Sequence, residues 1–200
     1  MKILALEFSS PVRSVAVAGG IDIVSGSEHG SRETKAFSLI DGVLRSAEVA
    51  KEEIECIAVG IGPGSYAGIR IAISIAQGWH LARGVKLIGI SSADCVAAQL
   101  HESGRRGIVN VAIDAQRGEL FAARYELGTD WRKLSDFALV TGNLNNELIV
   151  RPDVDAQLAP DAATLLTLAA SREDFVEASQ LEPIYLRKAE FVKAPPPRFT

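Results

Sequence analysis

Glu7 and Asp114 are two acidic residues that each lie at the end of a predicted strand, where a carboxylate could take part in chemistry. Each closes a short apolar run, a polar turn follows, and the chain returns as a second strand, so the pattern of residues 3–18 recurs at residues 108–127. Two such carboxylates facing each other would suit a divalent cation and the phosphates that it carries. Carboxylates in turns also serve as ordinary capping groups, and no third ligand completes a site, so a structural role is the favoured interpretation.

The glycine-rich stretch GIGPGSYAGIRIAISIAQGWHLA, residues 60–82, offers a second kind of chemistry. An apolar strand leads into Gly62, Pro63 and Gly64, and a helix is predicted to start near Ala67. Backbone N–H groups of such a turn and of a helix start bind anions. The P-loop is excluded because no Lys follows the glycines, and the dinucleotide fingerprint lacks an acidic residue about 20 positions later. Phosphate binding and plain close packing of strand on helix both remain open.

Metal and nucleophile sites are not predicted. None of the three histidines lies within four residues of another, as a paired-His metal site on a helix would require. Ser65 does not stand in a GxSxG pattern. Cys56 and Cys95 are far apart and lie among apolar residues, which argues against a disulfide framework or a cysteine zinc site. Peptidase chemistry is therefore disfavoured.

Composition limits the classes of partner. The chain has 200 residues, 48% of them hydrophobic, and a formal net charge of −4. That balance argues against broad electrostatic capture of nucleic acid by this chain alone, because phosphate binding relies on clustered Lys and Arg. The opening MKILALEF is too short for a signal peptide, and no run reaches the roughly 18 apolar residues of a membrane span. We expect a cytoplasmic protein without a membrane partner.

The predicted elements form two α/β subdomains facing each other across a cleft. Three strands in a meander come first, then an amphipathic helix, the glycine turn with the second helix, a strand at 85–90 and a helix ending near Glu102. The second unit starts with the repeated hairpin, continues with an interrupted β-like run at 139–150 and a helix at 160–170, and ends in a proline-rich tail. The predicted boundary gives subdomains 1–104 and 105–200.

The first two helices are predicted to form a partner surface. The second helix is apolar on most sides, apart from a narrow stripe of Arg70, Ser74 and Gln77, and one sheet face covers only part of two such helices. A partner with a matching helix pair, or a second copy of the chain, would complete a four-helix bundle. The residues predicted for this interface are Ala36, Phe37, Ile40, Val43, Leu44, Ala47, Ile69, Ala72, Ile73 and Ala76.

Four sequence blocks resemble a known family. The opening ILALEFSS, the glycine block GIGPGSYAGIRIAISIAQG, the hairpin DAQRGELFAARY and the ending EPIYLRK are similar, in this order, to blocks of the TsaB family, also called YeaZ. The resemblance implies the α/β fold of the actin, Hsp70 and sugar-kinase superfamily (ASKHA), with two subdomains each built on a mixed sheet with flanking helices. It also implies a role in forming N6-threonylcarbamoyladenosine at position 37 of tRNA.

The resemblance also implies partners and cofactors. In that system TsaB is a scaffold that binds and activates a catalytic paralogue, TsaD, and an ATPase, TsaE, joins the pair. The expectation for this chain is no cofactor of its own, with ATP and Mg²⁺ used by the assembled complex and tRNA contacted only through it. Alone, the chain is expected to form a homodimer.

Two departures from the family pattern concern the cleft. Family members usually carry Asp where this chain has Glu7, and the glycine pair that holds adenosine in nucleotide-binding relatives is matched only by Gly142, Asn143 and Leu144. We therefore predict a non-catalytic scaffold with a vestigial nucleotide-type cleft. The alternative is a nucleotide-dependent ATPase or kinase of the same fold. The cleft residues are Glu7, Ser9, Ser10, Gly62, Gly64, Ser65 and Asp114.

Overall fold

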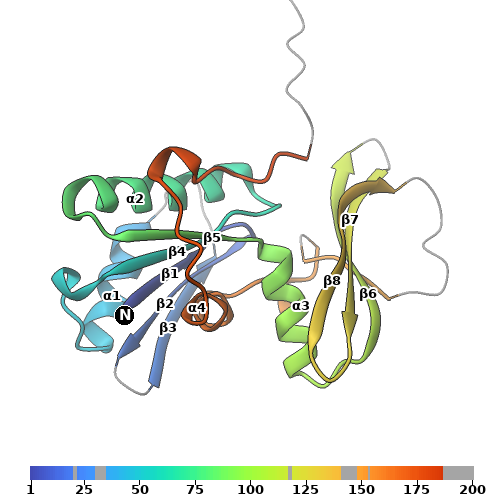
Figure 1. Ribbon diagram of the computed structural model, residues 1–200, viewed down its shortest axis with the longest axis horizontal. Helices are drawn as coiled ribbons and strands as arrows, with labels where there is room; N and C mark the ends of the chain where they lie inside the picture. Colours follow the sequence, from blue (N-terminus) through green and yellow to red (C-terminus); the bar gives the residue numbers. More distant parts are fainter. Residues whose placement is uncertain (20–21, 30–34, 117–118, 141–147, 153, 187–200) are drawn as a thin grey trace, which may run out of the picture.

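The computed structural model describes residues 1–19, 22–29, 35–116, 119–140, 148–152 and 154–186. Two mixed β-sheets lie at the two ends of an elongated molecule, with helix α3 between them (Figure 1). Residues 142–144, the incomplete match to the glycine pair of nucleotide-binding relatives, and the proline-rich tail fall outside the described residues. None of the helices in the described part is both long and apolar enough to cross a membrane.

The first sheet has five strands in the order β3-β2-β1-β4-β5. Strands β1, β2 and β3 form the predicted antiparallel meander, and β4 and β5 continue from β1 in parallel. Strands β1 and β4 are apolar almost throughout because helices cover both faces of the sheet at its centre. The bounds are β1 Ile3–Glu7, β2 Val12–Gly19, β3 Asp22–His29, β4 Cys56–Gly60 and β5 Lys86–Ile90.

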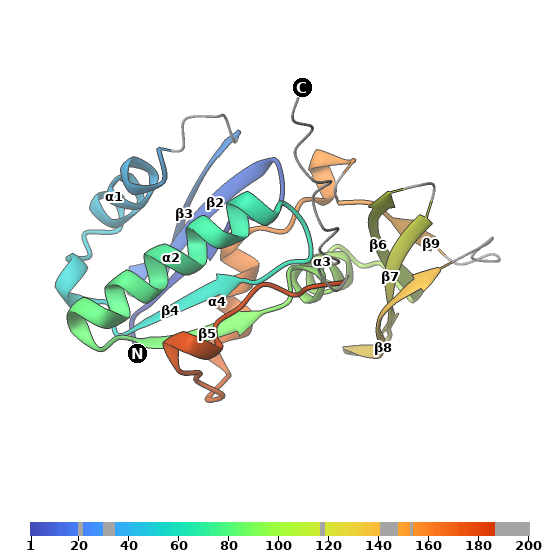
Figure 2. The ribbon, with the colours of Figure 1, turned by 90° about the horizontal axis from the view of Figure 1, so that it is seen from above.

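Helices α1 (Ala36–Ser46) and α2 (Tyr66–Arg83) pack on one face of this sheet, and α4 (Ala162–Ala170) packs on the other (Figure 2). The sequence-based division assigned the helix at 160–170 to the second subdomain, but the structure places α4 on the first sheet. Its buried side chains, Leu165 and Leu166 among them, belong to the same apolar cluster as Ile3, Ala5 and Ala58. The boundary at 104/105 itself stays a prediction.

The second sheet has four strands in the order β8-β7-β6-β9, and β9 lies parallel to β6. Strand β8 was not predicted, because its residues are mostly exposed and mix polar with apolar types. Helix α3 (Ser92–Glu102) covers the inner face of this sheet through an apolar cluster that includes Val96, Val109 and Tyr125. The bounds are β6 Gly107–Gln116, β7 Glu119–Leu127, β8 Trp131–Val140 and β9 Leu148–Val150.

The segment after α4 returns along the edge strand β5 and over α2. The amide of Val176 donates to the carbonyl of Leu87 at 2.9 Å, and that of Ile184 donates to the carbonyl of Ile61 at 2.9 Å. The side chain of Gln77 donates to the carbonyl of Ala178 at 2.7 Å. Gln77, which belongs to the predicted polar stripe of this helix, holds the returning segment and is half-buried. The second apolar side of α2 is thus partly covered by the chain itself.

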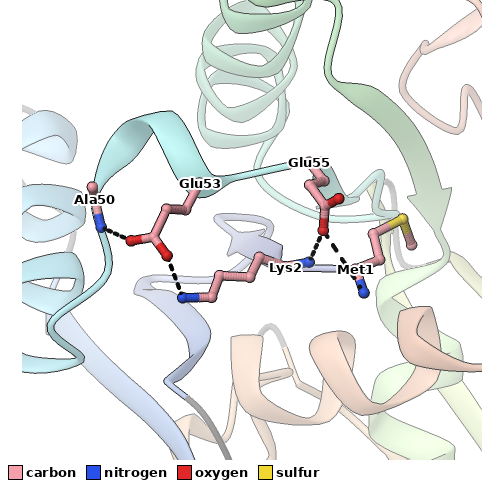
Figure 3. A network of polar contacts seen from close by, with 5 residues as sticks. All are labelled: Met1, Lys2, Ala50, Glu53 and Glu55. Atoms are coloured by element: carbon pink, nitrogen blue, oxygen red, sulfur yellow. Dashed lines mark hydrogen bonds and ion pairs between the residues drawn. The ribbon is translucent and has the colours of Figure 1, made fainter.

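Ionic contacts fasten the start of β1 to the 3-10 turn at Lys51–Glu53 (Figure 3). The Lys2 ammonium lies 2.8 Å from Oε1 of Glu53, whose Oε2 accepts from the amide of Ala50 at 2.8 Å. The Lys2 amide donates to the carboxylate of Glu55 at 2.6 Å. These contacts lie at the end of β1 opposite to Glu7, so they anchor the strand without taking part in the candidate site.

Candidate functional site

The Glu7 side chain, at the carboxyl end of β1, is fully buried. Its Oε1 accepts from the amide of Ser9 at 2.8 Å, and its Oε2 accepts from the hydroxyl of Ser92 at 2.8 Å. Gly60 leaves the space for this carboxyl, because a Cβ at that position would lie 1.9 Å from Oε2. Burial is the largest influence on the carboxyl and raises the pKa of Glu7, against the hydrogen bonds from Ser9 and Ser92 that lower it.

Two backbone amides of the glycine turn donate to groups within the protein. The amide of Gly62 donates to the Ser92 hydroxyl at 3.2 Å, and that of Ser65 donates to the carbonyl of Ser9 at 2.6 Å. The hydroxyl of Ser65 caps α2 by accepting from the amide of Gly68. Since an anion-binding loop offers such donors to its ligand, these contacts favour the close-packing interpretation of the turn.

Close packing explains why glycine occupies this turn. Gly62 and Gly64 have φ values of +88° and +155°, which residues with a Cβ rarely adopt. A Cβ at Gly64 would lie 2.1 Å from the carbonyl oxygen of Ser9, and one at Gly68 would lie 2.0 Å from that of Phe8. The backbone of the turn therefore lies directly on the loop that follows β1.

A small cavity lies between the two sheets. Ser9, Ser10 and Gly64 line it from the first sheet, and Val111 and Ile113 line it from the second. Its volume is about 20 Å³, roughly enough for a single water molecule. The structure thus brings three of the predicted cleft residues together around this cavity.

The other predicted cleft residues lie elsewhere. Glu7 and Gly62 are buried beneath the cavity, Ser65 caps α2, and Asp114 is exposed near the end of β6. Within the described residues no group of three or more His, Cys, Asp or Glu side chains is placed to hold a metal ion. The residues of this cleft do not fit the Mg²⁺-bound nucleotide that the fold superfamily implies, because the Glu7 carboxyl and the amides of Gly62 and Ser65 are already engaged by protein groups.

Sequence reasoning missed the partner of Glu7. Ser91 and Ser92 were not among the predicted cleft residues, but the Ser92 hydroxyl contacts Glu7 and the Ser91 hydroxyl donates to the carbonyl of Gly62 at 3.2 Å. Nothing in the spacing of these residues reveals contacts across more than 80 positions of the chain. A serine pair at the start of a helix is the one local signal, and it is equally typical of capping.

The outward side of the helix pair is the second candidate site. Phe37 of α1 is 66% exposed and Tyr66 of α2 is 51% exposed. Two open grooves run between the helices, with volumes of about 600 Å³ and about 360 Å³, and Phe37 lines both. The guanidinium of Arg70 lies over the Tyr66 ring, 5.3 Å from its centre, and the Tyr185 ring lies 6.1 Å from that of Tyr66. Exposed aromatic side chains beside an arginine are typical of protein interfaces.

The structure corrects the residue choice for the predicted helix-pair interface. Phe37 points outward, and Ala47 is half-buried. The remaining predicted residues pack under the helices in the protein's own core, because the apolar stripes of both helices face the sheet. The outward grooves are lined by Ala36, Phe37 and Ile40 of the predicted set and by residues that were not chosen, among them Tyr66, Arg70, Ile71 and Trp79. The residues buried in the core are Ala36, Ile40, Val43, Leu44, Ile69, Ala72, Ile73 and Ala76.

Comparisons of sequence point to proteins of tRNA modification. The family described as "TsaD: tRNA N6-adenosine threonylcarbamoyltransferase" matches residues 3–139. The "tRNA threonylcarbamoyladenosine biosynthesis protein TsaB" of Escherichia coli K12 is 31% identical over 128 residues, which cover 63% of this chain and 55% of that protein. The TsaB protein of Buchnera aphidicola subsp. Schizaphis graminum is 32% identical over 125 residues, which cover 62% and 60%. The match thus spans little more than half of these curated relatives.

Two solved structures are similar to this chain over more of its length than the sequence matches are. "YeaZ from Pseudomonas aeruginosa" superposes with a TM-score of 0.79 at 28% identity, covering 92% of this chain and 99% of that one. A second structure, titled as a protein with similarity to peptidase YEAZ from Pseudomonas aeruginosa, superposes with a TM-score of 0.80 at 28% identity, covering 93% and 99%. Together with the two mixed sheets and their flanking helices, these matches confirm the predicted ASKHA-type α/β fold.

Proposed function

The chain belongs to the TsaB (YeaZ) family, and we propose that it is a non-catalytic scaffold subunit of the complex that forms N6-threonylcarbamoyladenosine at position 37 of tRNA. Two findings support the pathway: the matching family is described as a tRNA threonylcarbamoyltransferase, and the TsaB relatives are named for threonylcarbamoyladenosine biosynthesis. The role within the pathway is argued from the two candidate sites. Among the described residues, the cleft between the sheets has no cluster of metal ligands. The outward face of α1 and α2 has exposed aromatic side chains that suit association with a partner.

The outward face of α1 and α2 is the observation that carries the scaffold role. Phe37 and Tyr66 leave more than half of their surfaces uncovered above an apolar groove, whereas large apolar side chains in the centre of the first sheet are fully buried. An exposed aromatic anchor over a groove is a common centre of binding energy in a protein interface. The proposed occupant is the helix pair of a TsaD-like catalytic paralogue, and a second copy of this chain occupies the same face when the paralogue is absent.

The remaining partners follow from this role. A TsaE-like ATPase would join the pair, ATP and Mg²⁺ would be used by the assembled complex, and tRNA would be bound through the complex. A net charge of −4 fits a subunit that does not capture tRNA alone. A tRNA-modifying role would place the protein in the cytoplasm.

The alternative, a nucleotide-dependent ATPase or kinase of the same fold, finds little support in the cleft. Its cavity of about 20 Å³ is far below the ~300 Å³ or more typical of ligand pockets. The carboxyl of Glu7 and the amides of Gly62 and Ser65 have protein partners. Calorimetric titration of the isolated chain with ATP and Mg²⁺ separates the two functions. We expect no saturable heat, and stoichiometric binding would favour the enzyme.

The scaffold proposal is tested by placing a charge on its proposed interface. Phe37→Asp should weaken binding to the TsaD-like paralogue, and self-association, by at least tenfold, which corresponds to about 1.4 kcal/mol. Ser38→Asp is the matched control, because Ser38 is exposed on the same helix but lines the side that faces β3. Ile40 is unsuitable for this test because it is buried in the core.

Calorimetry should measure the affinity for the paralogue and light scattering the mass in solution, after circular dichroism has shown that both variants fold. A folded Phe37→Asp variant that binds the paralogue and itself like the unmodified protein would show that the helix face is not the interface. Reconstituted threonylcarbamoyl transfer, run with and without this chain, then tests the pathway. Equal rates in both reactions would contradict an activating subunit.

A further inference from the structure

The buried carboxyl of Glu7 has no role in the proposed scaffold function, although a buried carboxyl is costly for a fold unless its hydrogen bonds are satisfied. Its Oε1 accepts from the amide of Ser9, and its Oε2 accepts from the hydroxyl of Ser92. Ser9 belongs to the same hairpin, whereas Ser92 is 85 residues away in the chain. The contact between Glu7 and Ser92 therefore joins two segments that lie far apart in the sequence.

Ser92 is the first residue of α3, and its hydroxyl is engaged on both sides. It donates to Glu7 at 2.8 Å and accepts from the amide of Gly62 at 3.2 Å. The Ser92 amide donates to the carbonyl of Gly62 at 2.8 Å. The start of α3 is thus fastened to the end of β1 and to the glycine turn at the same time.

Helix α3 packs against both sheets, with Cys95 in the apolar cluster of the first sheet and most of its other buried side chains against the second. Its apolar side packs on β6 and β7, and the hydroxyl of Tyr125 on β7 donates to the carboxylate of Asp94 at 2.8 Å. Figure 1 shows α3 lying between the two sheets. A constraint on the first residue of α3 is therefore a constraint on the position of the whole second sheet.

We propose that Glu7 is a positioning residue that sets the arrangement of the two sheets, through a bridge formed by the Glu7 carboxyl and the Ser92 hydroxyl. The bridge lies immediately beneath the small cavity between the sheets, where Ser92 is one of the lining residues. It holds the cavity closed by preventing the start of α3 from moving away from β1. This role is independent of the partner surface on α1 and α2.

The reach of the side chain makes the proposal specific for Glu. Gly60 provides the space in which the longer side chain lies, with Oε2 only 1.9 Å from the position of a Cβ on that glycine. Glu7→Asp keeps the charge but withdraws the carboxyl by one carbon–carbon bond, so it should lose the contact with Ser92. Glu7→Gln keeps the length, and its amide can accept from the Ser9 amide and donate to the Ser92 hydroxyl, so it should retain the bridge.

The test measures the distance between the sheets in the full chain. Spin labels are attached at Ser27→Cys on β3 and Ser135→Cys on β8, both at exposed serines, while the native Cys56 and Cys95 are buried. Electron–electron double resonance then gives the distance distribution. Ser92→Ala and Glu7→Asp should shift or broaden it by several ångströms, and Glu7→Gln should leave it unchanged. Hydrogen exchange at the Ser92 amide should become about tenfold faster in Ser92→Ala.

Ser10→Ala is the matched control for Ser92→Ala. Ser10 is also buried beside the cavity, but its hydroxyl donates to the carbonyl of Val12 within its own loop. An unchanged distance distribution in both Ser92→Ala and Glu7→Asp would overturn the proposal and leave Glu7 as a core residue only. An equal change in Ser10→Ala would also overturn it, because any lost hydrogen bond near the cavity would then loosen the sheets.

Discussion

The hairpins β1–β2 and β6–β7 share a sequence pattern but differ in the environment of the acidic residue that each carries. Glu7 is completely buried and hydrogen-bonded to Ser9 and Ser92. Asp114 is exposed near the end of β6, beside an irregularity in the pairing of β6 with β7. In both hairpins an apolar run ends in an acid, and neither acid is among the described residues that line the cavity between the sheets.

The difference lies in what packs against each hairpin. The glycine turn lies on the loop after β1, where a Cβ at Gly64 would lie 2.1 Å from the Ser9 carbonyl oxygen, and the start of α3 covers Glu7 from the other side. Asp114 is exposed to solvent. Two similar hairpins can therefore place one acid in the core and the other at the surface.

Of the substitutions that test this difference in packing, one in the glycine turn should have the largest effect on stability. Gly64→Val should destabilise the fold by more than about 4 kcal/mol, because the new side chain meets the Ser9 backbone and the residue must keep a φ of +155°. Gly78→Val is the matched control, since a Cβ on Gly78 meets nothing within 4 Å. Urea unfolding checks both variants. A stable, folded Gly64→Val protein would show that the turn does not need close approach.

Replacing each of the two acids should change the free energy of unfolding by less than Gly64→Val does, and by different amounts in the two hairpins. Glu7→Ala should lower the free energy of unfolding by about 2–4 kcal/mol, because it leaves a cavity and the unsatisfied Ser9 amide and Ser92 hydroxyl. Asp114→Ala should change it by less than about 0.5 kcal/mol, as is usual for an exposed position. Thermal and urea unfolding measure both values, and similar losses in the two variants would contradict the contrast in burial.

The same two variants should retain most activity of the reconstituted complex wherever subunit association is intact. Neither acid has the supporting ligands of a chemical site within the described residues. A loss of a thousandfold or more, equivalent to about 4 kcal/mol in the barrier, would assign chemistry to that acid.

The smallest expected effect is a dependence of stability on pH, and it should come from Glu7 in the first hairpin. Burial, reinforced by the charge of Asp161, raises the pKa of Glu7 above its ordinary value of 4.5, so the folded protein binds this proton more tightly than the unfolded chain. The stabilising contribution is fully present below about pH 4.5 and is lost as the pH rises through the folded pKa. The neighbouring Cys95 thiol stays protonated in this range because burial raises its pKa well above 9.0.

Urea unfolding from pH 4 to pH 8 should therefore show unmodified protein losing stability relative to Glu7→Gln as the pH rises, since glutamine does not titrate. A constant difference between the two proteins over this range would show that Glu7 keeps its ordinary pKa in the fold.

Most of the elements were predicted from local patterns. Alternation and short apolar runs gave β1, β2, β4 and β5. Helical spacing of apolar residues gave α1, and the residues that follow the glycine turn and the strand at 85–90 gave α2 and α3. Strand β8 escaped prediction because its pattern of exposure carries no clear period. Of the predicted cleft residues, Ser9, Ser10 and Gly64 line the observed cavity. The small volume of that cavity was not predicted.

The sequence by itself determined the family, the order of elements and the glycine turn, because these depend on residue types at short spacing. Only the tertiary structure decided that α4 packs on the first sheet, that the stripes of α1 and α2 face inward, and that Glu7 reaches Ser92. Each of these depends on segments far apart in the chain that compete for the same apolar surface. Periodicity identifies the face of a helix that is apolar, whereas the packing of the whole chain determines what covers it.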